Sequence, residues 1–170
     1  MKTLSAQLLQ SLKKLIGFHK DLFNTVKNEE DSLLEMEIKG IQEATRLKQA
    51  LIDAIEIEES HRISLTKTIS EKINIPYEDL TLRKIIHYLQ KSDIRIAESL
   101  DSAFRTLKVL TERISVQNNR NRIIVKNSIH HVDNMKNNLF QDKDPKAETY
   151  TPTGHKKNKA NGPKVISREV

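Results

Sequence analysis

The residues of this chain that could perform chemistry are histidines and carboxylates, and their spacing decides what they can do. Glu58 and His61 form one Glu-x-x-His pair, a spacing that places two metal ligands on the same face of a helix. A di-iron helical bundle needs two such pairs and two further inward glutamates. No other Glu precedes a His by three residues, and the adjacent His130 and His131 project about 100° apart on a helix. The sequence therefore predicts no metal site.

Two further polar groups fall inside rows of apolar residues. His19 lies on the apolar stripe of the first helical segment, so we expect a hydrogen-bonded core histidine rather than a metal ligand. Glu58 and Arg62 are four residues apart, a spacing that suits an ion pair along one helix. Neither pattern predicts catalysis.

The composition also disfavours an enzyme. The chain has no Cys and no Trp, and its four glycines stand alone rather than in a phosphate-binding loop. With four Phe and three Tyr in 170 residues, the core must be built from Leu and Ile, which pack along helices more readily than around a shaped cavity. A Ser/His/Asp triad is not excluded by the sequence, but no pattern favours one. We predict a protein without enzymatic activity.

The positive charge is divided between two parts of unequal length. Residues 141–170 carry seven Lys/Arg and four Asp/Glu, and residues 1–140 carry 22 and 19, so each part contributes +3 to the net charge of +6. Both signs are mixed along the longer part, which disfavours nucleic acid as a partner. No apolar run reaches the ~20 residues of a membrane span or resembles the apolar core of a signal peptide. We therefore expect a cytoplasmic protein without direct membrane insertion.

Apolar residues at helical spacing predict three long helices and one short helix. The first long helix covers residues 3–34, and the second extends to about Ile73 after a corner between Glu35 and Gly40. A connection this short forces the two helices to run antiparallel. The predicted fold class is all-α: an elongated antiparallel bundle of three long helices with a short connecting helix and a flexible C-terminal tail.

The remaining boundaries follow from proline and from capping residues. Pro76 ends the second helix, and the short third helix ends near Gln90. The candidate N-caps are Asp79 and Thr81 for the third helix and Ser92 and Asp93 for the last helix. Residues 1–140 form the predicted bundle domain. Residues 141–170, rich in Pro, Gly and Lys, form the predicted flexible, partner-binding tail.

The last helix carries a long stripe of residues spaced three and four apart, without Gly or Pro. Its members are Ala97, Leu100, Phe104, Leu107, Thr111, Ile114, Asn118, Asn121, Val125, Ser128, Val132, Met135 and Leu139. An asparagine in such a stripe lowers stability and selects the pairing register, so we assign a structural, register-setting role to Asn118 and Asn121. A hydrated kink or the end of the bundle is the alternative interpretation.

The end of this stripe is the predicted binding surface for a partner protein. The residues assigned to it are Val125, Ile129, Val132, Met135, Leu139 and Phe140 on the helix, with Val165 and Ile166 in the tail. We expect the helical residues to continue past the ends of their neighbouring helices, where an amphipathic partner helix can cover them. The alternative is that they belong to the core of the bundle.

Three segments resemble the FlgN family of flagellar type III export chaperones. They are DSLLEMEIKGIQEATRLKQALIDAIEIEESHR, PYEDLTLRKIIHYL, and QNNRNRIIVKNSI followed by TYTPTG. In the first segment, Lys48 and Arg62 are similar to basic positions of the family. The resemblance covers nearly the whole chain, and the Asn-rich segment with the downstream Tyr150 is its most specific part.

The resemblance implies a chaperone that uses no ATP, metal or other cofactor. Such a protein binds the C-terminal helices of the hook-associated (hook-filament junction) proteins and presents them to the membrane export gate. It also implies that Tyr150 contributes to docking on the gate, although Tyr150 could instead pack back on the bundle. A structural coiled-coil protein that self-associates through the same stripe is the alternative function. The sequence does not decide which junction protein is preferred or whether the free protein is monomeric.

Overall fold

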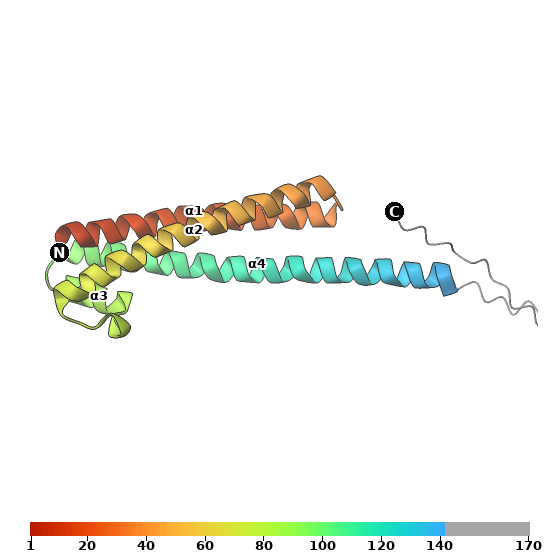
Figure 1. The fold of residues 1–170 in the computed structure, drawn as a ribbon. Helices are drawn as coiled ribbons and strands as arrows, with labels where there is room; N and C mark the ends of the chain where they lie inside the picture. Colours follow the sequence, from red (N-terminus) through yellow and green to blue (C-terminus); the bar gives the residue numbers. More distant parts are fainter. Residues whose placement is uncertain (142–170) are drawn as a thin grey trace, which may run out of the picture. The chain divides into compact units, whose positions relative to one another are not determined.

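The computed structural model describes residues 1–141, which are helical apart from short connections (Figure 1). The elements are α1 (Lys2–Leu34), α2 (Ile38–Ile73), the 3-10 helix η1 (Tyr77–Asp79), α3 (Leu82–Gln90) and α4 (Ile94–Gln141). The prediction of an all-α fold with three long helices and one short connecting helix is confirmed. Contacts divide the chain into two units, Met1–Val125 and Lys126–Val170. The boundary between a domain of residues 1–140 and a tail stays a prediction.

The corner between α1 and α2 consists of residues 35–37, within the predicted range, and the two helices pack antiparallel (Figure 1). Met36 has a φ of 56°, in the left-handed region that side-chain-bearing residues seldom adopt. The N–H of Glu37 donates to the carbonyl oxygen of Ser32 at 2.9 Å and so closes the end of α1. Gly40 lies in the first turn of α2, where a Cβ atom would overlap the Ser32 hydroxyl oxygen. Glycine at this position therefore lets the two helices approach closely.

Three further helix ends are closed by residues of types that favour such positions. Asn74 ends α2 in the left-handed conformation, with φ 56° and ψ 41°. The Thr81 hydroxyl accepts a hydrogen bond from the N–H of Lys84 at 3.3 Å and caps α3. A carboxylate oxygen of Asp93 accepts from the N–H of Ile96 at 3.3 Å at the start of α4. Thr81 and Asp93 are thus the caps among the four predicted candidates.

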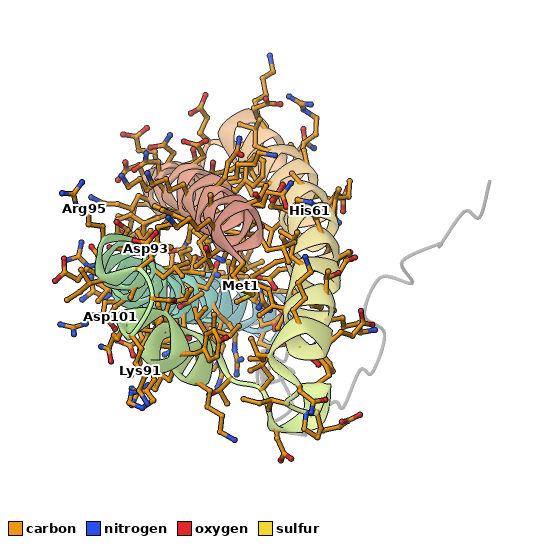
Figure 2. The ribbon with its side chains drawn as sticks, turned by 90° about the vertical axis from the view of Figure 1, so that its left-hand side faces the viewer. Met1, His61, Lys91, Asp93, Arg95 and Asp101 are labelled. Carbon is orange, nitrogen blue, oxygen red and sulfur yellow. The ribbon has the colours of Figure 1, made fainter. Side chains whose placement is uncertain are left out.

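The main core gathers side chains from all four α-helices of the first unit. It includes Leu8, Leu12 and Leu15 of α1, Ile69 of α2, Ile85 and Leu89 of α3, and Ala97, Leu100 and Ala103 of α4. Figure 2 shows these helices in end view, with Lys91, Arg95 and Asp101 pointing away from the core. Burying each Leu or Ile side chain stabilises the fold by about 2 kcal/mol, so this cluster dominates the packing of the first unit.

Along α4, the buried residues of the first unit recur every three or four positions and form what we call the seam. They are Ala97, Leu100, Ala103, Leu110, Ile114, Gln117 and Asn121, with the half-buried Leu107 filling the interval between Ala103 and Leu110. The predicted stripe is right for the row through Leu100, Ile114 and Asn121. The other row of the predicted stripe, which runs through Thr111, is wrong by one residue, because Leu110 is buried and Thr111 is exposed. Compared with the predicted stripe, the buried side of α4 is therefore rotated by one residue, which removes a leucine rather than a threonine from water. The same rotation places Gln117 on the buried side of the helix and Asn118 on the exposed side.

Candidate partner-binding surface

Four large apolar side chains of the second unit are exposed on α4, and we call them the apolar row. They are Ile129, Val132, Met135 and Leu139, with exposed fractions of 57%, 62%, 52% and 70%. At about 100° per residue they fall within an arc of roughly 120° on one side of the helix. Val125, in the first unit, is 39% exposed. Contiguous exposed apolar side chains of this size mark surfaces that bind another protein.

The opposite side of the same helical segment is polar. His130, Asn134 and Asn137 are exposed there, and Lys126 and Asp133, next to them outside the apolar arc, carry charges of opposite sign. The segment is therefore amphipathic, as required for helix-in-groove recognition of a partner helix. Nothing in this arrangement activates a nucleophile or holds a phosphate. What the surface can do is bury apolar area against another chain.

A cluster of hydrogen-bonded polar side chains, which we call the polar layer, links α1, α2 and α4 within the first unit. Lys48 Nζ lies 3.0 and 2.9 Å from the two carboxylate oxygens of Glu29. Asn121 Nδ2 donates to the same carboxylate and to the carbonyl oxygen of Val26, both at 2.8 Å. Gln117 Nε2 in turn donates to Asn121 Oδ1 at 3.2 Å.

The bonds of the polar layer depend on the register of α4. Asn121 is only 4% exposed, so its amide cannot exchange these partners for water without a rearrangement. A shift of α4 by one turn would leave the Asn121 amide and the Glu29 carboxylate without these bonds, at a cost of about 1–3 kcal/mol for each unsatisfied group. The register-setting role assigned to Asn121 stays a prediction. Asn118 is exposed, so its predicted place among the buried residues was wrong.

Glu58 of α2 is buried and faces α1 rather than forming the predicted pair with Arg62. Lys14 Nζ lies 3.4 Å from Glu58 Oε2, and His61 Nδ1 lies 3.3 Å from Oε1. Arg62 instead pairs with Glu59, with 2.7 Å between Arg62 Nε and Glu59 Oε2. The prediction of an ion pair between Glu58 and Arg62 was therefore wrong, because Glu58 is on the side of α2 that packs on α1.

Burial raises the pKa of Glu58, but Ser11, His61 and Lys14 lower it by more, so the net pKa is below the ordinary value of 4.5. Within residues 1–141 the Ser11 hydroxyl has no hydrogen bond of standard geometry. Glu58 is thus a charged carboxylate held between the side chains of Lys14 and His61. The Glu58–His61 pair that drew attention in the sequence belongs to helix packing.

The remaining histidines have simple environments. His19 is buried, and its Nδ1 lies 2.7 Å from the carbonyl oxygen of Leu15, which confirms a hydrogen-bonded core histidine. His130 and His131 are exposed. Within residues 1–141, no group of three or more His, Asp or Glu side chains could hold a metal ion. None of the helices in the same range combines the length and the apolar character that crossing a bilayer requires.

Several predicted site residues fall where the structure gives no side-chain geometry. Phe140 belongs to α4, and nothing is known of its side chain. Tyr150, Val165 and Ile166 lie outside the described residues 1–141. Their assigned roles in substrate and export-gate binding stay predictions.

Sequence reasoning missed several residues of these sites. The partners of Asn121 in the polar layer were not identified, although Gln117 is four residues before Asn121, the spacing of a hydrogen-bonded pair on a helix. The pairing of Glu29 with Lys48 joins two helices, and no spacing along the chain reveals such a contact. The heptad spacing of Val109, Val116 and Ile123, which are all exposed on α4, was visible in the sequence and was overlooked.

The fold and these surfaces define a class of protein: an all-α protein with exposed apolar helix faces, in which the polar clusters join the helices to one another. The family model described as FlgN protein matches residues 1–158. The chain therefore belongs to the FlgN family, which is a family of flagellar export chaperones, and the resemblance seen in the sequence is confirmed. No curated protein and no solved structure matches the chain.

Proposed function

We propose that this protein is a cytoplasmic chaperone of the hook-associated flagellar proteins and that it delivers them to the membrane export gate. Membership of the FlgN family supports the general role. The observation that carries the finer proposal is the apolar row, whose four side chains are each more than half exposed. Val125 and Phe140 flank the row along α4 and extend the proposed surface.

The C-terminal helices of the hook-associated proteins are the proposed substrates. An amphipathic helix that polymerises with its neighbours in the assembled filament must be covered before export, and the apolar row offers a complementary face. Because the substrate segment orders itself only on binding, part of the interaction energy offsets that ordering, and the complex stays releasable. Val165 and Ile166 are proposed to add apolar contacts from the tail.

The test is to measure the mass of the purified chain by light scattering, alone and with each hook-associated protein. The proposal expects a defined complex with at least one of these proteins, and no complex with a substrate that lacks its C-terminal helix. A chain that is already a stable oligomer and binds none of them would favour the self-associating coiled coil instead.

Tyr150 is proposed to be the anchor at the export gate. A single buried aromatic side chain can dominate a small interface. Tyr150→Ala should leave the affinity for substrate within about threefold, because a tenfold change requires ~1.4 kcal/mol, while binding to the gate protein and secretion of the substrates fall. Equal loss of substrate and gate binding, or normal secretion, would refute the separate roles.

A further inference from the structure

A groove on the first unit lies between α1 and α4, away from every residue discussed for substrate binding. It has a volume of about 420 Å³, with Phe23 of α1 on one side and Val109 and Val116 of α4 on the other. Val109 and Val116 are 46% and 57% exposed, and Ile123, one heptad further along α4, is 50% exposed. These three residues follow each other at intervals of seven, so they form a straight apolar line along the helix.

The groove is bordered by positive charge. Arg113 and Arg120 both line it, and Lys27 Nζ lies over the ring of Phe23, a lining residue, at 5.8 Å from the ring centroid. Among residues 1–141, none of these three cations forms an ion pair. Glu112 is the acidic side chain in the lining, and it pairs with Lys108 at 3.8 Å. The groove therefore combines an apolar floor with unpaired cations.

We infer that this groove is a second docking site, and that it binds an acidic amphipathic helix of a partner protein. Arg113 and Arg120 are seven residues apart, or about 10.5 Å along the axis of α4. A helix lying alongside α4 presents carboxylates at positions i and i+7 with the same spacing, and its own apolar residues at heptad spacing can pack between Val109, Val116 and Phe23. Carboxylates paired with arginine in a fixed geometry supply specificity.

Other occupants fit the groove less well. A second copy of this face would place arginines against arginines, which opposes self-association through the groove. Nucleic acid would leave the valine side chains without a partner, and single-stranded binding sites stack successive bases on several aromatic rings, whereas Phe23 is the one aromatic residue among the lining residues of this groove. The inference goes beyond the proposed function, because it concerns neither the apolar row nor the tail.

The test uses two designed helical peptides of about three heptads that share one apolar face and carry either Glu or Lys at the flanking positions. The full chain should bind the Glu peptide, and the double variant Arg113→Glu/Arg120→Glu should bind it at least tenfold more weakly. The same variant should gain affinity for the Lys peptide, a charge exchange that shows the variant is folded. Lys91→Glu/Arg95→Glu is the matched control and should bind the Glu peptide like the natural chain (Figure 2).

A second variant tests whether the apolar contacts of the groove contribute to binding independently of its charges. Val116→Asp should also weaken the Glu peptide at least tenfold, whereas Ile57→Asp, at a side chain of α2 that is 73% exposed and lies outside the groove, should leave that affinity unchanged. The inference is overturned if the Glu peptide does not bind, or if the arginine variant binds it as tightly as the natural chain does. It is also overturned if phosphatidylglycerol vesicles or polyuridylate bind through Arg113 and Arg120 while the Glu peptide does not.

Discussion

Two stretches of α4 contain similar side chains and differ in burial. In the seam, Leu100, Leu110 and Ile114 are at most 8% exposed, and in the apolar row every side chain is more than half exposed. Both stretches carry aliphatic residues on one side of the helix at intervals of three and four. What differs is the neighbour: α1, α2 and α3 supply partners to the seam, and within residues 1–141 the apolar row is left open.

The comparison shows what periodicity can and cannot predict. A row of aliphatic residues at helical spacing identifies a face that is able to pack, and it does not say whether the partner belongs to the same chain. At the end of the seam, hydrogen bonds of polar side chains show that the partner of α4 belongs to the same chain. Gln117 and Asn121 are buried and bonded to each other, and Asn121 also bonds to α1, so the intramolecular packing is specified at this level of α4.

The largest effect on stability is expected in the seam. Leu100 is fully buried, so Leu100→Ala should lower the free energy of unfolding by about 3 kcal/mol through lost burial and a residual cavity. Leu139→Ala removes the same atoms from a side chain that is 70% exposed and should change stability by less than about 0.5 kcal/mol. Chemical denaturation of both variants measures the difference. Equal losses would show that the two stretches are packed alike.

The polar layer should show the next largest effect. Lys48→Met keeps the aliphatic stem of the side chain and leaves the Glu29 carboxylate without its cation. Because the two side chains are 24% and 12% exposed, we expect a loss of about 2 kcal/mol, less than the ~3–5 kcal/mol of a fully buried pair.

A double-mutant cycle checks the origin of this loss. Glu29→Gln in the Lys48→Met background should cost little more, because the unpaired charge is gone. Arg46→Met, which breaks the exposed pair with Glu43, is the control and should leave the melting temperature unchanged. A purely additive cycle at Glu29 and Lys48 would show that the polar layer is not energetically coupled.

Glu58 should give a smaller, pH-dependent effect. Its pKa in the folded protein is below 4.5, so its charged form contributes stability that is fully present above that value and is lost as the pH falls through the folded-state pKa. Glu58→Gln should lower the free energy of unfolding by about 1 kcal/mol at pH 7, and the difference from the natural protein should shrink as the pH falls below 4.5. Unfolding curves across this range test the sign. A difference that grows as the pH falls would contradict the assignment.

Much of the fold could be predicted from the sequence because it rests on local signals. The ends of the helices follow from Pro76, Thr81 and Asp93, and the corner follows from the break in the apolar pattern before Gly40. The register of α4 was half right, since choosing between Leu110 and Thr111 requires knowing the direction in which the neighbouring helices lie. Contacts between distant residues, such as Lys48 with Glu29, leave no periodic signal in the chain.

The candidate site could be predicted in part for the same reason. Ile129, Val132, Met135 and Leu139 were identified from their spacing, and the structure gives their exposure. Their substrate is a property of another chain and is not encoded in spacing. The groove beside Phe23 was not anticipated, because it forms only when α1 and α4 are brought together.

The smallest effect on stability is expected from Val132→Asp combined with Met135→Asp, and this double variant tests the central claim. Both side chains are more than half exposed, so the free energy of unfolding should change by less than about 0.5 kcal/mol. The matched control is Asn134→Asp with Asn137→Asp, which adds the same charge to the opposite side of the helix.

The decisive measurement is the affinity of these two variants for a purified hook-associated protein, with thermal unfolding recorded on the same samples. If the apolar row is the substrate-binding surface, the double variant at Val132 and Met135 should bind at least tenfold more weakly, a change of about 1.4 kcal/mol or more, while the control binds normally. Unchanged affinity in the Val132/Met135 variant, or a large loss of its melting temperature, would contradict the account.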